Sequence, residues 1–213
     1  MAIFNMKYKE NWKILLVLIL FISFSVFILA QDDILNEIYL DLLEKYDSIK
    51  TYEADFIQEN FWKELDIAKT SYGKIYYDSS FLLLEYMEPE GQKLLVDSIS
   101  VTIYDAASNQ VLISNKNDYE LKPISIISDY WENSQKELIE NTENGTWIKL
   151  ITPENEQIFV WIKDNLIIEI QIFDNSENMV KYSFSAEKIN KQLSQNIFEL
   201  NLPEDVNVID NRQ

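Results

Sequence analysis

The sequence predicts a mainly β protein: an antiparallel sheet of about ten strands, with one helix before it and a short helical insert in its middle. One segment has apolar residues at helical spacing, whereas most of the remaining chain alternates apolar and polar residues with the period of a half-buried strand. The alternating segments are short and are separated by turn sequences, which is typical of an antiparallel meander. A sheet of that many strands usually closes or nearly closes, because this removes exposed edges.

The first 30 residues have the three parts of a secretory signal peptide. Residues 14–29 carry no charge, and Ala30 offers a small residue for cleavage before Gln31. Sixteen helical residues span about 24 Å, which is shorter than the ~30 Å hydrocarbon core of a bilayer and favours cleavage. Ile28 stands where a small residue is usual, so an uncleaved anchor is the alternative. The positive start comes from three lysines: Lys7, Lys9 and Lys13.

Residues 31–213 form a single domain by length, and they are strongly acidic. Without the first 30 residues, the chain keeps 15 of its 18 basic and 35 of its 36 acidic residues, a net charge of −20. This charge argues against binding of nucleic acid, and solubility is its simplest explanation. The chain has no cysteine, so it forms no disulfide and is not itself a lipoprotein. We expect a monomer in a compartment of the cell envelope, exported by a cleaved signal peptide.

The first predicted element is a helix over residues 34–50, whose apolar residues recur every three or four positions. From Thr51 the period changes to two. The strands predicted in the first half are 51–62, 70–78, 81–87, 92–97, 100–105 and 110–114. The rhythm breaks at residues 117–139, where we expect one or two short helices. Strands resume at 147–151, 157–163, 166–173 and 179–186, and a last apolar piece covers 197–202.

The turns between the later strands have good turn sequences. They are Asn144-Gly145, Asp164-Asn165 and the run Asp174-Asn175-Ser176. We found no internal repeat.

The residue inventory excludes most enzyme mechanisms. The chain has neither histidine nor cysteine, which removes the common nucleophile arrangements and leaves a zinc site only carboxylates. Ser71 and Lys74 spell the S-x-x-K motif, but that serine must open a helix and here lies in a strand pattern. A carboxylate pair such as Asp55 and Glu59 is explained by surface charge opposite Phe56. We therefore expect no catalytic residue, no metal and no cofactor.

Large apolar side chains are in excess for a sheet with one buried face. Residues 81–84, and residues 166–168 at the start of the segment 166–172, are apolar at consecutive positions, which indicates strands that are apolar on both faces. An ordinary packed core explains the composition alone, and an apolar ligand cavity is the alternative.

Several short segments occur in the order and spacing of one known family, although no single segment is specific. They are Tyr46, Ile49, Thr51 and residues 53–58; residues 73–77; Leu84, Tyr86 and Pro89; Val96-Asp97; Tyr104-Asp105; residues 109–111; and Phe198, Leu200, Pro203 and residues 208–212. Through them the chain resembles the outer-membrane lipoprotein carriers, the LolA-type periplasmic chaperones, over nearly all of residues 34–213.

The resemblance implies a half-open, incomplete antiparallel β-barrel of about ten or eleven strands, with the N-terminal helix and the helical insert as a lid. It also implies a cavity that receives acyl chains of lipoproteins or of another lipid, and shuttling from the inner to the outer membrane. An inner-membrane donor complex and an outer-membrane receptor would then be partners. The alternative on the same fold is a regulatory module that senses lipid or lipoprotein.

The two-residue period assigns side chains to this cavity, if Glu85 points outward. The cavity residues are Ala54, Phe56, Ile75, Tyr77, Leu82, Leu84, Tyr86, Leu94, Val96, Ile168, Ile170, Ile172, Val180, Tyr182 and Phe184. The lid residues are Ile38, Leu42, Ile124, Ile127 and Trp131.

One departure from the family concerns the lid. The family's carriers have an arginine about six residues after the glycine of the second strand, where it hydrogen-bonds the lid. In this chain that position is Ser79, and the only arginine is Arg212. Ser79 or Asp78 can contact a lid, but neither offers five donors in a rigid fork. The arginine latch therefore does not carry over.

Overall fold

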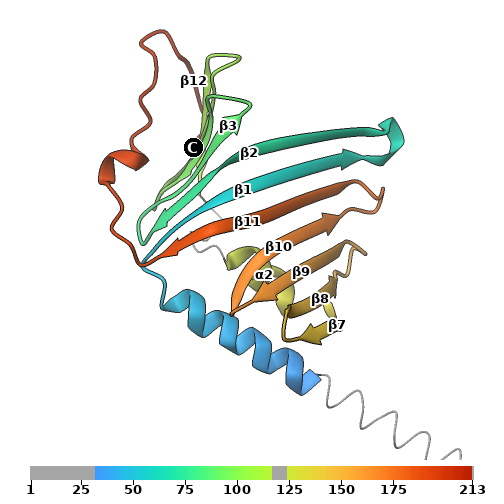
Figure 1. The fold of residues 1–213 in the computed structure, drawn as a ribbon. Coiled ribbons are helices and arrows are strands. Elements are labelled where there is room, and N and C mark those ends of the chain that lie inside the picture. The colour runs from blue at the N-terminus through green and yellow to red at the C-terminus, as the bar shows by residue number, and fades with distance from the viewer. Residues whose placement is uncertain (1–31, 117–123, 213) are drawn as a thin grey trace, which may run out of the picture. The chain divides into compact units, whose positions relative to one another are not determined.

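The computed structural model describes residues 32–116 and 124–212 (Figure 1). The predicted signal peptide and residues 117–123 of the predicted insert lie outside these ranges. The chain divides into two compact units, Met1–Leu40 and Asp41–Gln213. In the first unit, residues 32–40 are described and are helical. Within the described ranges, no helix has the length and apolar character needed to cross a membrane.

The second unit begins with helical residues 41–47 and is otherwise mostly β structure. Its first meander contains β1 (Thr51–Trp62), β2 (Ile67–Asp78), β3 (Leu82–Glu88), β4 (Gln92–Val96), β5 (Ser100–Asp105) and β6 (Gln110–Asn115). Its second contains β7 (Gln135–Thr142), β8 (Gly145–Ile151), β9 (Gln157–Lys163), β10 (Leu166–Phe173) and β11 (Met179–Ile189). The remaining elements are η1 (Lys63–Leu65), α2 (Ser125–Trp131), η2 (Gln195–Phe198) and β12 (Asn207–Asp210).

All twelve strands form one sheet, in the order β12-β6-β5-β4-β3-β2-β1-β11-β10-β9-β8-β7. The two meanders meet where β1 pairs with β11, so strands from the two ends of the chain lie side by side in the middle of the sheet (Figure 1). All neighbours are antiparallel except β12, which runs parallel to β6. The sheet does not close, because β12 and β7 remain at its edges. The predicted mainly β, half-open architecture is therefore confirmed.

The predicted hairpin turns are also confirmed. Asp164 and Asn165 connect β9 to β10 with φ angles of 53° and 56°, the left-handed conformation that asparagine and aspartate tolerate best. In the turn between β10 and β11, Asp174 Oδ1 accepts hydrogen bonds from the backbone N–H groups of Ser176 (2.8 Å) and Asn178 (2.9 Å).

Two strands were not predicted. β7 overlaps the end of the segment expected to be helical, residues 117–139, and its register shifts between Leu138 and Glu140, which breaks the alternation. β12 is short and exposed at all four positions, and its two apolar residues, Val208 and Ile209, are adjacent rather than alternating. The apolar piece at 197–202 forms part of η2 and irregular backbone. The sheet thus has twelve strands where ten or eleven were expected.

The sheet has two faces, which the strand register defines. We call the face of the sheet that carries the Phe56 side chain the inner face. It includes the residues that the strand pairing places on the same side as Phe56. The opposite face is the outer face. Ion pairs between neighbouring strands cross the outer face from β11 to β4: Lys188–Glu53, Lys181–Glu59, Lys74–Asp55 and Lys93–Glu85. The outer face of the central strands is therefore polar.

The outer face of β3 differs, since Leu83 lies there and is fully buried. Beside it, the Phe81 ring stacks on the ring of Phe198 in the C-terminal segment, with 5.2 Å between centroids. The expectation that the run 81–84 is apolar on both faces is thus confirmed.

Candidate functional site

The inner face is assembled by the register of the eleven antiparallel strands β1 to β11. Phe56 of β1 lies opposite Gly73 of β2 and Phe184 of β11. The pairing then continues outward through Ile75 to Leu84 and Leu94 on one side, and through Tyr182 to Ile170 on the other. Fourteen of the fifteen residues assigned to the cavity share this face: Ala54, Phe56, Ile75, Tyr77, Leu82, Leu84, Tyr86, Leu94, Val96, Ile170, Ile172, Val180, Tyr182 and Phe184.

Ile168 is the exception, and its assignment was wrong. The register of β10 against β9 shifts between Ile167 and Glu169, so Ile168 is the extra residue of a bulge. Ile167 pairs with Ile162 and takes the position on the inner face, where it is buried. A strict two-residue period assigns the wrong residue here because a bulge inverts the alternation beyond it.

Helix α2 covers the inner face at the β7–β10 end of the sheet. Lys136 of β7 is in register with Leu150, and its ammonium group lies 5.5 Å from the centre of the Trp131 ring of α2. Trp131 therefore lies over the face that carries Leu150. Four inner-face residues of β8 and β9 are at most 1% exposed: Ile148, Leu150, Ile158 and Val160. Ile124 and Ile127 at the start of α2 are also buried.

The helical residues 41–47 also contact the sheet, in addition to α2. The backbone N–H of Ile167 donates a buried hydrogen bond of 3.2 Å to Tyr46 Oη. Burial raises the pKa of Tyr46 to about 12. Burial also raises the pKa of Tyr52 on the inner face, and the nearby Tyr46 adds to that shift. Leu42, on the same helical segment, is buried too.

Of the predicted lid residues, Leu42, Ile124, Ile127 and Trp131 are thus buried in the second unit. Ile38 belongs to the first unit, and its part in a lid stays a prediction. Asp78 ends β2, and Ser79 follows it in the turn to β3. There, Asp78 Oδ1 accepts hydrogen bonds from the backbone N–H groups of Ser80 (2.7 Å) and Phe81 (2.9 Å), while Ser79 is exposed.

The inner face is less covered toward the other edge of the sheet. Leu94 of β4, Ile103 of β5 and Leu112 of β6 are in register on this face. Ile103 is 43% exposed, and its two neighbours are half-buried. Half-buried aromatic and aliphatic side chains continue on β11, namely Val180, Tyr182 and Phe184. The inner face is therefore apolar both where α2 covers it, at the β7–β10 end, and toward β4, β5 and β6, where solvent reaches it.

Aromatic rings dominate the centre of the inner face. The Tyr86 ring meets the Phe56 ring edge to face, with 5.1 Å between centroids, and Tyr182 stacks on Phe184 at 6.4 Å. The Tyr86 hydroxyl donates to Gln58 Oε1 at 2.7 Å, so this polar pair is satisfied within the face. Burial raises the pKa of both Tyr86 and Tyr182, which keeps these hydroxyls neutral.

Several inner-face residues were missed by the sequence analysis. Residues Ile148, Leu150, Ile158, Val160 and Ile162 show clear two-residue alternation, so the signal was present in the sequence. Tyr52 and Gln58 also follow the period of Ala54 and Phe56. Ile103 and Leu112 come from short strands whose alternation is weak.

The charged residues of the described ranges do not meet the requirements of a metal site. No group of three or more carboxylates within residues 32–116 and 124–212 is arranged to hold a metal ion. Arg212 pairs with Asp210, two residues away, through a 2.9 Å hydrogen bond from Nε. The sole arginine is thus engaged in the C-terminal tail.

Comparison of the sequence with known families gives one match that covers most of the chain. The family described as "Outer membrane lipoprotein carrier protein LolA" matches residues 47–201. The chain belongs to this family. LolA family proteins are carriers associated with the cell envelope, which supports a role in binding lipid or lipoprotein. The LolA match covers almost all of the second unit, including every strand that builds the inner face.

Solved structures show the same LolA-like fold at low sequence identity. An uncharacterized conserved protein from Thermus thermophilus is 16% identical, with a TM-score of 0.54 over 82% of this chain and 98% of its own. MucB is 8% identical, with a TM-score of 0.53 over 78% of this chain and 62% of its own. No curated protein matches the sequence.

Proposed function

We propose that the protein binds the acyl chains of lipoproteins, or of another lipidated cargo, on its inner face and carries them from the inner to the outer membrane. The observation that supports this most directly is the apolar inner face, which α2 covers at one end and which solvent reaches at the other. A domain that only needed a core would not leave Leu94, Ile103 and Leu112 in register and accessible.

The energetics favour a carrier for such cargo. Burial of one methylene is worth ~0.8 kcal/mol, so a sixteen-carbon chain exposed to water costs on the order of 12 kcal/mol. A lipidated protein therefore needs an apolar surface to cross an aqueous compartment, and the surface must release it afterwards. In this proposal the protein binds and releases its cargo without making or breaking a covalent bond, and no residue of the site acts as a catalyst.

The helices would act as a lid that a ligand displaces. Two contacts support this role: the Ile167–Tyr46 hydrogen bond and the Trp131–Lys136 contact. Each is a single interaction worth about 1 kcal/mol, and it adds to the burial of the apolar lid residues in the closed state. This arrangement would replace the family's arginine latch. Export by a cleaved signal peptide, a monomeric state, a donor complex and a receptor complete the proposal.

A matched pair of substitutions tests the site. Ile103 on the inner face and Ile57 on the outer face are 43% and 38% exposed, and both lie in strands. Ile103→Asp should weaken the binding of an apolar fluorescent probe about tenfold or more, whereas Ile57→Asp should leave it unchanged, because only the first places a charge on the inner face.

Native mass spectrometry of the exported protein after mild extraction should show bound lipid or lipoprotein. The proposal fails if the protein never carries lipid and the probe finds no site. Deleting the gene separates it from the lipid-sensing alternative: loss of a carrier leaves lipoproteins in the inner membrane, whereas loss of a sensor changes a stress response and leaves lipoproteins in place.

A further inference from the structure

The hairpin that joins β1 to β2 ends in a cluster of exposed apolar side chains. Trp62, Leu65 and Ile67 are 39%, 67% and 49% exposed; Leu65 ends the single turn of η1, while Trp62 ends β1 and Ile67 begins β2. We call these three side chains the hairpin tip. The pairing of β2 with β3 stops at Tyr72, so the residues of β2 nearest the tip extend beyond β3 (Figure 1).

The backbone of the hairpin tip is held firmly although its apolar side chains are exposed. The backbone N–H of Lys63 donates to Asn178 Oδ1 at 3.1 Å, and the Lys63 ammonium pairs with Glu177. Asn178 is itself fixed by Asp174, since its side-chain amide donates to Asp174 Oδ2 at 2.8 Å. The turn between β10 and β11 therefore supports the tip and presents its side chains in a fixed arrangement.

We infer that the hairpin tip inserts into the interface of a lipid bilayer and brings the protein briefly to a membrane. Three protruding side chains are far too few for a stable protein–protein interface, which buries about 800 Å² on each partner. A convex apolar tip instead matches a surface that deforms around it. Tryptophan at the base of such a tip also suits the headgroup region, where its ring and N–H meet both environments.

The charge of the protein around the hairpin tip determines which kind of lipid headgroup the tip can approach. Lys63 is paired with Glu177, Glu64 and Asp66 flank Leu65, and residues 31–213 carry a net charge of −20. Anionic headgroups would repel this surface, so we commit to a bilayer of zwitterionic lipid. The same repulsion keeps the contact weak and reversible. This inference does not depend on the inner face holding a ligand.

The absence of cysteine makes a direct test simple, because one introduced cysteine can be labelled at a single site. An environment-sensitive dye on Leu65→Cys should shift to the blue when phosphatidylcholine vesicles are added at about 1 mM lipid, which suits weak binding. Ile99 is a matched control, because it is 70% exposed and lies in the turn between β4 and β5, at the opposite end of the strands. A dye on Ile99→Cys should not shift.

Vesicle flotation of the exported protein gives the second readout. Leu65→Asp should reduce binding to phosphatidylcholine vesicles about tenfold or more, the loss expected for one buried leucine, whereas Ile99→Asp should have no effect. Inclusion of phosphatidylglycerol should weaken binding of the unmodified protein. Apolar-probe binding to the inner face should be unchanged in Leu65→Asp, which separates this test from that of the proposed function.

Three results would overturn the inference. The first is a dye shift of equal size at both sites. The second is flotation of Leu65→Asp at the level of the unmodified protein. The third is a change in oligomeric size on Leu65→Asp without a change in flotation, which would assign the tip to a second copy of the chain.

Discussion

Gly73 lies on the inner face at a position where neighbouring atoms leave no room for a side chain. A Cβ atom at this position would lie 2.4 Å from the carbonyl oxygen of Glu85 on β3 and 2.6 Å from Cζ of Phe56 on β1. The Phe56 ring thus lies directly over the glycine, and it reaches Tyr86 beyond. A glycine in the middle of a strand otherwise weakens the strand, so its presence here reflects close approach of a neighbour.

Gly73→Ala should destabilise the protein by about 1–3 kcal/mol, the usual cost of an overpacked core. The added methyl group meets a backbone oxygen as well as a flexible ring, so the fold cannot absorb it by rotating a side chain. Urea denaturation measures the loss. In the double variant with Phe56→Leu, the ring contact is relieved but the backbone contact remains, so only part of the alanine effect should disappear. Full recovery would show that the backbone contact does not matter.

The ionisation of Tyr46 makes the stability of the folded protein depend on pH in the alkaline range. Its pKa in the folded state is about 12, above the unfolded value of about 10, so folding favours the protonated phenol. This contribution is fully present below about pH 10 and is lost as the pH rises toward 12. Tyr46→Phe should lower stability at pH 7 by about 1–3 kcal/mol, because the Ile167 N–H loses its acceptor.

The same variant should lose less stability than the unmodified protein between about pH 10 and pH 12, because it lacks one phenol whose pKa is raised by folding. Chemical denaturation at several pH values measures both effects. Tyr72→Phe is the control, since Tyr72 is exposed on the outer face. A parallel decline for all three proteins would contradict the assignment.

Among the elements, the faces of the strands could be predicted from the sequence better than the positions of the helices. The two-residue period was sufficient to place fourteen of fifteen residues on the inner face, because antiparallel register transmits one face across neighbouring strands. It failed at Ile168, where a bulge changes the count, and in β7, where apolar Leu138 and Ile139 are adjacent. β12 is paired with β6, and its two apolar residues, Val208 and Ile209, are adjacent and exposed, so no alternation marks it as a strand.

The lid could not be predicted in detail for another physical reason. The contacts that fix it join residues far apart in the chain, such as Tyr46 with Ile167, or depend on a side chain of an unpredicted strand, such as Lys136 with Trp131. The helical period identifies an apolar face but does not say which part of a sheet that face will cover. The resemblance implied a lid, and the register of β7 with β8 shows which part of the sheet α2 contacts.

The lid predicts a specific link between stability and access to the inner face. Ile127 of α2 is 1% exposed, so Ile127→Ala should cost about 2–4 kcal/mol through the cavity it leaves. It should also increase binding of an apolar dye, because α2 then covers β7–β10 less well. Ile139→Ala, at a position 49% exposed in β7, should change stability by less than about 0.5 kcal/mol. Loss of stability with no increase in dye binding would show that α2 is fixed core structure.

For the whole molecule, net charge should dominate the response to salt. Residues 31–213 carry 35 acidic and 15 basic residues, so like charges repel one another in the compact state. The ion pairs across the outer face offset little of this, because exposed pairs are worth less than about 1 kcal/mol each.

The melting temperature should therefore rise by a few degrees as sodium chloride is increased from about 0.02 M to about 0.3 M, since salt screens the repulsion. Differential scanning calorimetry measures the change. A variant with several exposed glutamates replaced by glutamine should melt at a higher temperature in low salt and respond less to added salt. A melting temperature that falls with salt would show that the ion pairs outweigh the repulsion.

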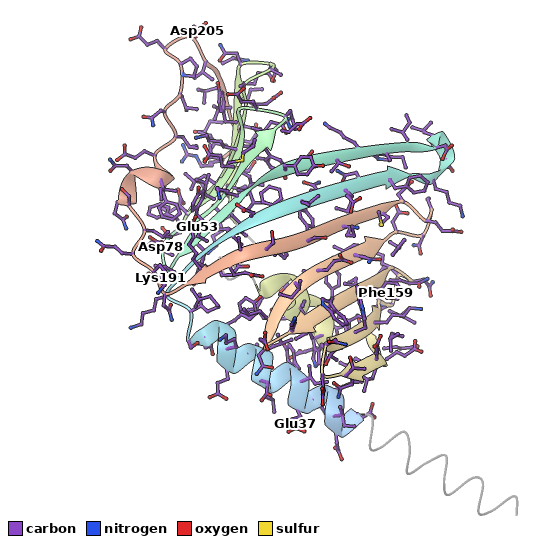
Figure 2. All side chains as sticks on the ribbon, viewed as in Figure 1. Glu37, Glu53, Asp78, Phe159, Lys191 and Asp205 are labelled. Carbon is purple, nitrogen blue, oxygen red and sulfur yellow. The ribbon has the colours of Figure 1, made fainter. Side chains whose placement is uncertain are left out.

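The junction between β1 and β11 also determines when folding can finish. Asn190, just after β11, donates from its side chain to the carbonyl oxygen of Ser48 (3.1 Å) and accepts from the backbone N–H of Lys50 (2.7 Å). Thr51 Oγ1 donates to the carbonyl oxygen of Lys191 at 2.6 Å, at the end of the sheet where Lys191 is labelled in Figure 2. These contacts span about 140 residues, a high contact order that slows folding. The central strand β1 thus gains its second neighbour only once nearly the whole chain has been synthesised, so a chain exported during or soon after synthesis would still be unfolded enough to be threaded through a translocation channel.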